Sequence, residues 1–263
     1  MTTNMNLFGS GRSFSKTESK GNQMKECKNN YWYKTDFLGY EAASEWVSSK
    51  VLEGSGAFFV EYELVPNTNP VQCRSENFLE NGESIVTVNR LFEKILGINI
   101  AKKCATMEVK ASIEWFVNSL EEMTGLTGFG RYLSGMLALD TIILNEDRHF
   151  RNIAVIRSGS GFRFAPIFDN GAAFLSDCYS YPKGNTERNY LEDLVSNTEV
   201  KPFGHTFDEQ LDACEELYGT PLQFNFVDVR SSELSKYYDD EVITRIDFVL
   251  RESRRKYKYL FKE

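Results

Sequence analysis

The chain has 263 residues, a formal net charge of −8 and 41% apolar residues, among them 20 Phe and 13 Tyr. This composition supports a sizeable core and excludes global disorder, and the length suits one large domain or two smaller lobes that share a cleft. The acidic balance argues against general nucleic-acid binding, because contacts to phosphate dominate that affinity. We therefore expect no direct binding of nucleic acid.

The cysteines, the histidines and the apolar runs narrow the setting further. Five Cys are scattered without a CxxC pair, and there are two His. This pattern is typical neither of a disulfide framework nor of a zinc site, and it favours a reducing compartment. No apolar run has the length of a signal peptide or of a membrane span. We expect a cytoplasmic globular protein that does not bind a membrane.

The first hundred residues read as a mostly β-rich segment with one helix. Residues 1–30 are polar and rich in Gly, Ser, Lys and Asn, which is typical of a flexible tail or a mobile loop. The spacing of apolar residues then predicts a strand over 31–34, a helix over 40–53, a hairpin-like pair of strands over 57–65 and 71–79, and mixed strand and helix signals over 85–96.

After about residue 100 the pattern becomes helical. It predicts helices over 107–125, 129–144, 207–218 and 239–260, and a strand hairpin over 152–157 and 161–168. The fold class expected is α+β, with a small β-rich N-terminal lobe and a larger, mainly helical C-terminal lobe. We place the boundary near 97–107, which gives lobes of 1–100 and 101–263.

The stretch NEDRHFRNIAVIRSGSGFRFAPIFDNGAAF, residues 145–174, carries the chemistry. Asp147 follows a buried helix, Asn152 opens a strand, and Asp169 follows the second strand, two residues before Gly171. A hairpin brings these side chains to one edge of a small sheet. Such hard oxygen ligands suit Mg²⁺ or Mn²⁺ bound together with substrate phosphates. We expect Asp169 and Asn152 to hold the ion and Asp147 to accept the proton of an attacking hydroxyl.

Each part of this stretch alone is more often structural, because Asp-Arg-His can end a helix and Asp-Asn-Gly is a common turn. Their joint occurrence favours a catalytic site. D-R-H-x-x-N followed by P-x-x-D-x-G, within residues 140–174, resembles the HipA-like serine/threonine kinases of bacterial toxin–antitoxin modules and, more distantly, the phosphoinositide kinases. The resemblance implies a two-lobed protein-kinase-like fold that transfers the γ-phosphoryl group of ATP, with Mg²⁺ (or Mn²⁺), to a Ser or Thr hydroxyl.

Phosphoryl transfer also needs a cation for the nucleotide phosphates and an acid that positions it. Lys34 ends the aromatic strand YWYK and is the best candidate, although a surface lysine is the competing interpretation. Glu45 and Glu41 both lie on the following predicted helix. Glu45 is preferred for its spacing, as the resemblance implies a Glu soon after this Lys, and Glu41 stays an alternative.

The segment FGSGRSFS occupies the place of a glycine-rich nucleotide loop, with Gly9, Ser10 and Gly11 covering the phosphates. A GxG pattern is weak, and a flexible tail is the other interpretation. HipA-like kinases phosphorylate a serine of their own in this loop. The resemblance therefore implies Ser13 and Ser15 as autophosphorylation sites, where an added dianion is repelled by the ATP phosphates.

Other residues are assigned supporting roles. Glu61 and Tyr62, in a predicted strand, offer backbone groups to adenine. Asp140 lies on an apolar helix face, where a buried carboxylate needs partners, and Arg148 is a candidate partner. His149 can brace the catalytic loop through a backbone carbonyl. We expect Asp140, Arg148 and His149 to support the site without taking part in the chemistry.

The resemblance also implies partners. The acceptor is expected to be a protein, such as a translation component, and a small antitoxin is a possible partner. The chain is shorter than full-length HipA proteins and starts near the glycine loop, so a separate small protein can supply the missing subdomain.

Two rival functions stay open: a kinase of a lipid or small-molecule hydroxyl, and a degenerate kinase that serves as a nucleotide-binding module. The basic run at 251–262 is interpreted as a solvated helix face.

Overall fold

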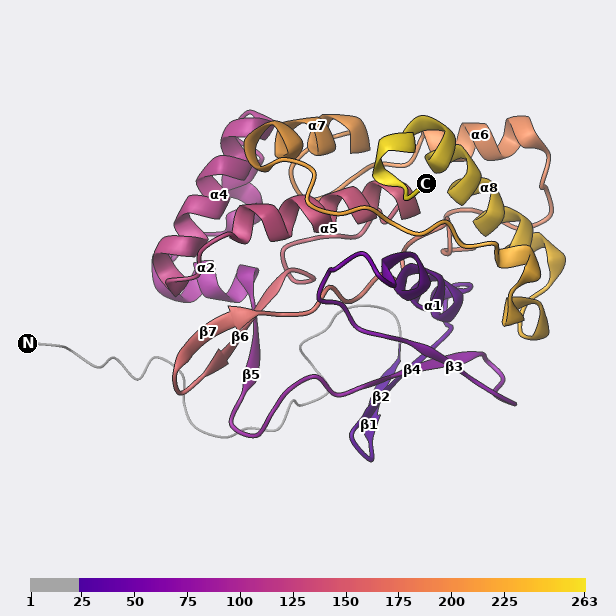
Figure 1. Ribbon diagram of the computed structural model, residues 1–263, viewed down its shortest axis with the longest axis horizontal. Helices are drawn as coiled ribbons and strands as arrows, with labels where there is room; N and C mark the ends of the chain where they lie inside the picture. Colours follow the sequence, from indigo (N-terminus) through magenta and orange to yellow (C-terminus); the bar gives the residue numbers. More distant parts are fainter. Residues whose placement is uncertain (1–23) are drawn as a thin grey trace, which may run out of the picture.

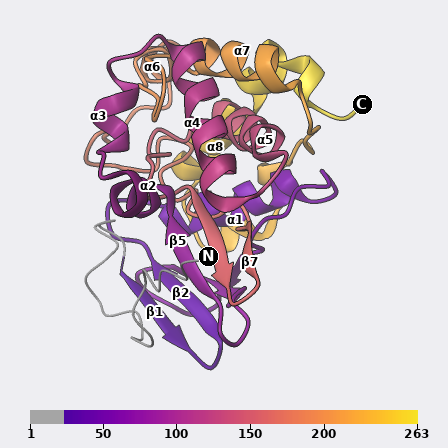
Figure 2. The ribbon, with the colours of Figure 1, turned by 90° about the vertical axis from the view of Figure 1, so that its left-hand side faces the viewer.

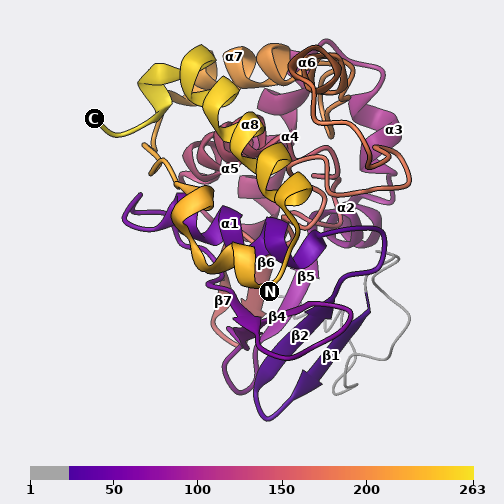
Figure 3. The same cartoon turned by 90° about the vertical axis from the view of Figure 1, so that its right-hand side faces the viewer.

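The structure, a computed structural model, describes residues 24–263 of the chain. Two antiparallel sheets lie below a group of helices in Figure 1, and α1 (Glu41–Leu52) runs between the first sheet and those helices. The two side views show the same division, with the helices above and the strands below (Figures 2 and 3). The fold class is therefore α+β, as predicted.

The first sheet belongs to the N-terminal part of the chain and has the strand order β1-β2-β4-β3. Its strands are β1 (Lys25–Lys28), β2 (Tyr31–Thr35), β3 (Glu63–Val65) and β4 (Gln72–Glu76). The register places Lys25 opposite Lys34, and Lys34 opposite Cys73. Because cross-strand partners share a face, the two lysines extend from the same side of the sheet.

The second sheet combines strands from both parts of the chain, in the order β5-β6-β7. These are β5 (Ser84–Thr87), β6 (Ala154–Ser158) and β7 (Gly161–Phe164). β6 and β7 form a hairpin around the turn predicted at 158–161, and β5 pairs antiparallel with β6. The hairpin that connects Asn152 to Asp169 is thereby fixed to a strand from the first hundred residues.

The helices form most of the core. They are α2 (Val88–Leu96), α3 (Ile100–Cys104), α4 (Val109–Thr124), α5 (Phe129–Ile143), α6 (Arg188–Ser196), α7 (Phe207–Tyr218) and α8 (Asp240–Lys256), with short 3-10 turns at η1 (Val229–Ser231), η2 (Glu233–Lys236) and η3 (Lys258–Leu260). α5 is apolar on nearly every side and packs against α4, α7 and α8. Within residues 24–263 no helix combines the length and apolarity needed to cross a membrane.

Three predicted strands are shorter in the structure, and the one expected over 71–79 is β4, which ends at Glu76. The strand expected over 57–65 begins only at Glu63, and the one expected over 161–168 ends at Phe164. The residues left out of β3 and β7 pair with each other instead: Val60 N donates to Ile167 O at 3.0 Å, and Ile167 N donates to Phe58 O at 2.8 Å. The prediction missed β1, α3 and α6. The structure confirms, within a few residues at their ends, the helices expected over 40–53, 107–125, 129–144, 207–218 and 239–260. The largest difference is at the end of α8, which stops at Lys256.

Candidate active site

The loop after α5 holds Asp147 and Asn152 close together. The helix ends at Ile143, and the next residue, Leu144, adopts a left-handed φ of 51°. The chain then turns tightly, because His149 N donates to Asp147 O and Asn152 N donates to His149 O, each at 2.8 Å. The side-chain amide of Asn152 donates to Asp147 O at 3.1 Å. This contact uses the Asn152 Nδ2 atom, so it leaves the Asn152 Oδ1 atom available as a ligand.

Arg148 joins this loop to the segment that carries Asp169. Its guanidinium is fully buried and binds both carboxylate oxygens of Asp140 at 2.9 Å. It also donates to Asn152 O at 3.3 Å and to Phe168 O at 2.6 Å. Burial by itself lowers the pKa of Arg148, but the Asp140 carboxylate outweighs it and raises that pKa. The contact expected between Asp140 and Arg148 is therefore present.

Asp169 lies between two lysines of the first sheet. Its carboxylate accepts from Lys34 Nζ at 2.9 Å and from Lys25 Nζ at 2.9 and 3.1 Å. Burial by itself raises the pKa of Asp169, but the two ammonium groups outweigh it and hold that pKa well below its usual range. Asp169 also has a φ of 61°, a conformation that costs free energy in a non-glycine residue and is frequent at functional sites.

Lys34 pairs with Glu45, the preferred of the two candidate acids. The Lys34 ammonium forms an ion pair with Glu45 Oε1, while Glu45 Oε2 accepts from Asn170 N at 2.9 Å. Glu41 instead accepts from the backbone amides of residues 37–39, at 2.8 to 3.1 Å. Burial lowers the pKa of Lys34, but Asp169 and Glu45 outweigh it and raise that pKa.

The other predicted residues lie in different surroundings. Tyr62 is buried, with its ring centroid 5.2 Å from Lys34 Nζ, whereas Glu61 is exposed. Residues 77–83 connect the first sheet to the second. In this segment the ring of Phe78 lies 6.1 Å from the ring of Phe168, next to Asp169 in sequence. The adenine-binding role of Glu61 and Tyr62 stays a prediction. Gly9, Ser10, Gly11, Ser13 and Ser15 lie outside the described residues.

Two lysines at the site were missed by the sequence patterns. Lys25 belongs to β1, which was not predicted as a strand. Lys201 Nζ lies 2.8 Å from Asp147 Oδ1, although 54 residues separate the two in sequence. His149 Nε2 lies 3.8 Å from Asp147 Oδ2, while its buried Nδ1 has no partner among residues 24–263, so the expected brace to a backbone carbonyl is absent from this part of the chain.

The donor set fits a magnesium–nucleotide complex. Asp169 and Asn152 provide a carboxylate and an amide oxygen, the ligands that Mg²⁺ takes when phosphates complete its shell. Lys34, paired with Glu45, would provide the ammonium group for the phosphates. Within residues 24–263 no group of three or more His, Cys, Asp and Glu side chains forms a metal cluster of its own. A Mg²⁺ ion bound largely through phosphate oxygens needs no such cluster.

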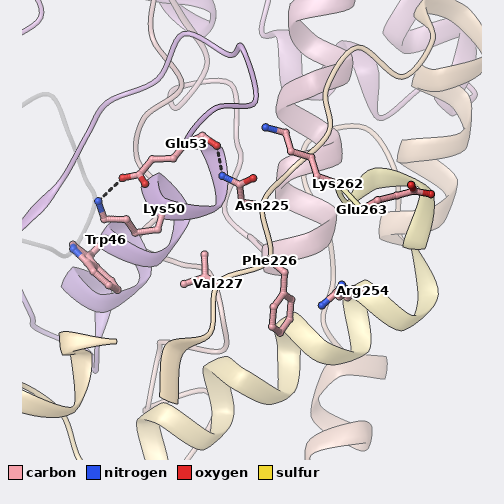
Figure 4. Close-up of a pocket in the computed structure, with 9 residues that line it drawn as sticks. All are labelled: Trp46, Lys50, Glu53, Asn225, Phe226, Val227, Arg254, Lys262 and Glu263. Atoms are coloured by element: carbon pink, nitrogen blue, oxygen red, sulfur yellow. Dashed lines mark hydrogen bonds and ion pairs between the residues drawn. The ribbon is translucent and has the colours of Figure 1, made fainter. Parts of the chain in front are cut away.

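A pocket of about 560 Å³ lies apart from these residues (Figure 4). It opens beside the C-terminal half of α1, and Lys50, Arg254 and Lys262 line it together with aromatic side chains. Figure 4 shows the Lys50–Glu53 pair and the contact between Glu53 and Asn225, three residues that also line the pocket. None of the residues predicted for catalysis lines this pocket.

No protein-family model matches the chain, and no curated protein matches it in sequence. Solved structures do. The Helicobacter pylori proinflammatory kinase CtkA is similar with a TM-score of 0.54 and 14% identity, over 91% of this chain and 92% of that one. HipA of Shewanella oneidensis MR-1, solved with HipB and operator DNA, gives a TM-score of 0.46 and 12% identity, over 95% of this chain and 67% of that one. The similarity to CtkA shows a kinase-like fold and confirms the fold expected from the sequence resemblance.

Proposed function

We propose that this kinase-like chain transfers the γ-phosphoryl group of Mg-ATP to a Ser or Thr hydroxyl of a protein. The observation that carries the proposal is the set of contacts around Asp169. Lys34 of the first sheet binds Asp169 from the loop after β7, and Glu45 of α1 holds both Lys34 and the backbone next to Asp169. A kinase-type site needs this lysine, this acid and this aspartate to meet.

The remaining roles follow from the donor chemistry. When bound, Mg²⁺ and ATP supply the transferable phosphoryl group and the charge that screens its oxygens. Asp169 and Asn152 are assigned to the metal, and Lys34 to the nucleotide phosphates. Asp147 is assigned as the base, because its carboxylate is partly exposed next to Asn152 and can reach an incoming hydroxyl. Asp140 and Arg148 keep this loop in place.

Several finer features belong to the proposal. Gly9, Ser10 and Gly11 are proposed to cover the nucleotide, with Ser13 and Ser15 as autophosphorylation sites. The division into lobes of 1–100 and 101–263 is proposed on the change of sequence pattern near residue 100, and a small partner protein on the sequence resemblance. A lipid or small-molecule acceptor is the rival, and labelling of protein against lipid fractions distinguishes the two. The presence of all of Lys34, Asp147, Asn152 and Asp169 argues against a degenerate nucleotide-binding module.

The test compares two isosteric substitutions. Asp147→Asn should reduce phosphoryl transfer from γ-labelled ATP by roughly 10² to 10⁴-fold, because the general base is lost, while Mg-ATP binding stays close to that of the wild type. Asp169→Asn should instead weaken Mg-ATP binding, since a metal ligand is lost. Intact mass after incubation with Mg-ATP reports self-modification, and calorimetry reports binding.

Asp212→Asn is the matched control, since Asp212 is an exposed carboxylate on α7. It should leave both transfer and binding unchanged. Transfer at the wild-type rate by Asp147→Asn would remove that residue as the base. A wild-type chain that binds no Mg-ATP would refute the proposed function as a whole.

A further inference from the structure

We infer that Lys201 is a further catalytic residue, which binds the transferred phosphoryl group during transfer. This inference rests on the proposed function and adds a phosphate-binding side chain to it. Its starting point is the contact between Lys201 Nζ and Asp147 Oδ1, at 2.8 Å. Lys201 comes from the segment 197–206 between α6 and α7, and not from the loop that carries Asp147.

The ion pair does not by itself explain why Lys201 lies there. The side chains of Lys201 and Asp147 are 56% and 39% exposed, and exposed pairs contribute little to stability. The segment is instead held by its apolar neighbours. Val200 and Phe203 are both buried on either side of Lys201. The position of the lysine is therefore imposed by core packing, and its ammonium group remains movable.

The packing directs the segment onto the catalytic loop itself. The Phe203 ring lies 5.3 Å from the ring of Phe150, in the loop between Asp147 and Asn152, and 5.4 Å from the ring of Phe116. The backbone amide of Phe203 donates to Gln210 Oε1 at 3.1 Å. The segment that carries Lys201 therefore packs directly on the loop that carries Asp147, the proposed base.

Phosphoryl transfer next to Asp147 requires a positive charge, because negative charge is spread over the phosphoryl oxygens in the transition state. The attacking hydroxyl lies within hydrogen-bond distance of Asp147, so the phosphoryl group it attacks is within reach of Lys201. The new oxygen–phosphorus bond forms as the bond to ADP breaks, and the hydroxyl proton passes to Asp147. Lys201 keeps its proton and donates hydrogen bonds to the phosphoryl oxygens, where charge is spread in the transition state. Arg148 of the same loop has its donors directed at buried protein acceptors.

The first measurement needs no turnover. Calorimetry compares Mg-ADP alone with Mg-ADP plus aluminium fluoride, which imitates the phosphoryl group in transfer. Lys201→Met should weaken binding of the fluoride complex about tenfold or more, and binding of Mg-ADP by less than about threefold. Lys201→Arg keeps the charge and should recover most of the affinity. In turnover assays, Lys201→Met should lower kcat with little change in the KM for ATP.

The control is Lys256→Met, because Lys256 and Asp208 form a similarly exposed pair, 54% and 49%, between α8 and α7. It should leave both affinities and kcat unchanged. Equal affinity of Lys201→Met and the wild type for the fluoride complex would overturn the inference, and so would equal losses for both ligands. With Asp147→Asn still inactive, the proposed function would stand. A wild-type chain that binds no Mg-ADP would instead refute the proposed function, and the inference with it.

Discussion

Glu45 uses its two carboxylate oxygens for two different partners. One oxygen binds the Lys34 ammonium, and the other accepts from the backbone amide of Asn170, directly after Asp169. The residue is fully buried, so both contacts are screened little by water. Glu45 therefore fixes the lysine and the aspartate segment with respect to each other. Glu41, one helical turn earlier, accepts hydrogen bonds from the amides that precede the helix.

The same isosteric substitution at both positions separates these roles. Glu45→Gln should lower phosphoryl transfer by roughly 10 to 100-fold and destabilise the fold by about 3 kcal/mol, because a buried charge loses its partner. Glu41→Gln should cost about 1 kcal/mol, as for a weakened helix cap, and leave transfer unchanged. Urea unfolding and transfer from labelled ATP measure the two effects. Equal transfer by both variants would contradict the assignment of Glu45.

The sequence indicated Asp147, Asn152 and Asp169 because their spacing and flanking strands are local features. It favoured Glu45 but could not exclude Glu41, since residues four apart lie on one helix face. The choice depends on the conformation of residues 37–39, which has no periodic signal. Lys201 could not be found either, because its position depends on the packing of a distant loop.

At the scale of elements, the start of α1 is attached to the segment that follows Asp169. Gly39 forms a bridge with Asp177, and Cys178 N donates to Leu38 O at 3.1 Å. Tyr40 OH also binds the carbonyl oxygens of Phe174 and Leu175. The approach is so close that a Cβ atom at Gly39 would lie 1.9 Å from the backbone oxygen of Ser176.

Gly39→Ala should therefore destabilise the protein by about 2 kcal/mol or more, because backbone must move to admit the methyl group. The variant should also lose transfer activity, since α1 carries Glu45. Thermal or urea unfolding measures the first effect and labelled ATP the second.

Gly159→Ala is the matched control. A Cβ there meets no atom within 4 Å, and its φ is not in the left-handed region. It should behave as the wild type does. A Gly39→Ala variant as stable as Gly159→Ala would show that the junction adapts without cost.

The elements predicted well are those with a strong periodic pattern, such as α4 and α5. The run AFFVEYELV reads as one long strand, yet Phe58 and Val60 pair with Ile167, more than 100 residues later. Local alternation cannot reveal such a long-range partner. α6 was missed because Leu191 is its single fully buried residue, so its apolar pattern is faint.

At the scale of the whole molecule, Asp36 connects the first sheet to the C-terminal region. Its carboxylate accepts from Ala42 N at 2.7 Å and from Tyr238 OH at 2.8 Å, across 202 residues. Burial raises the pKa of Asp36 to about 7, although both hydrogen bonds act in the opposite direction. The folded protein therefore favours the neutral acid, and ionisation of Asp36 opposes folding.

Stability should depend on pH through this group. Because the folded pKa is raised, the contribution of Asp36 is complete below its unfolded pKa near 3.8 and is lost as pH rises through about 7. Asp36→Asn cannot ionise, so the variant should gain stability relative to the wild type as pH rises. The difference between about pH 4 and about pH 8 should be on the order of 4 kcal/mol.

Urea unfolding of both proteins across this range measures the difference, from which titrating groups that do not interact with Asp36 cancel. Parallel stability curves would show that Asp36 titrates normally. A relative loss of stability at high pH would reverse the predicted sign.

The pairing of β5 with β6 has a practical consequence. Separate expression of residues 1–100 and 101–263 would remove β5 from the hairpin and leave the edge of β6 open to other chains. Such fragments should form insoluble material. A cut within 77–83 keeps all three strands of the second sheet on one polypeptide, and is the better place to divide the chain for fragment complementation.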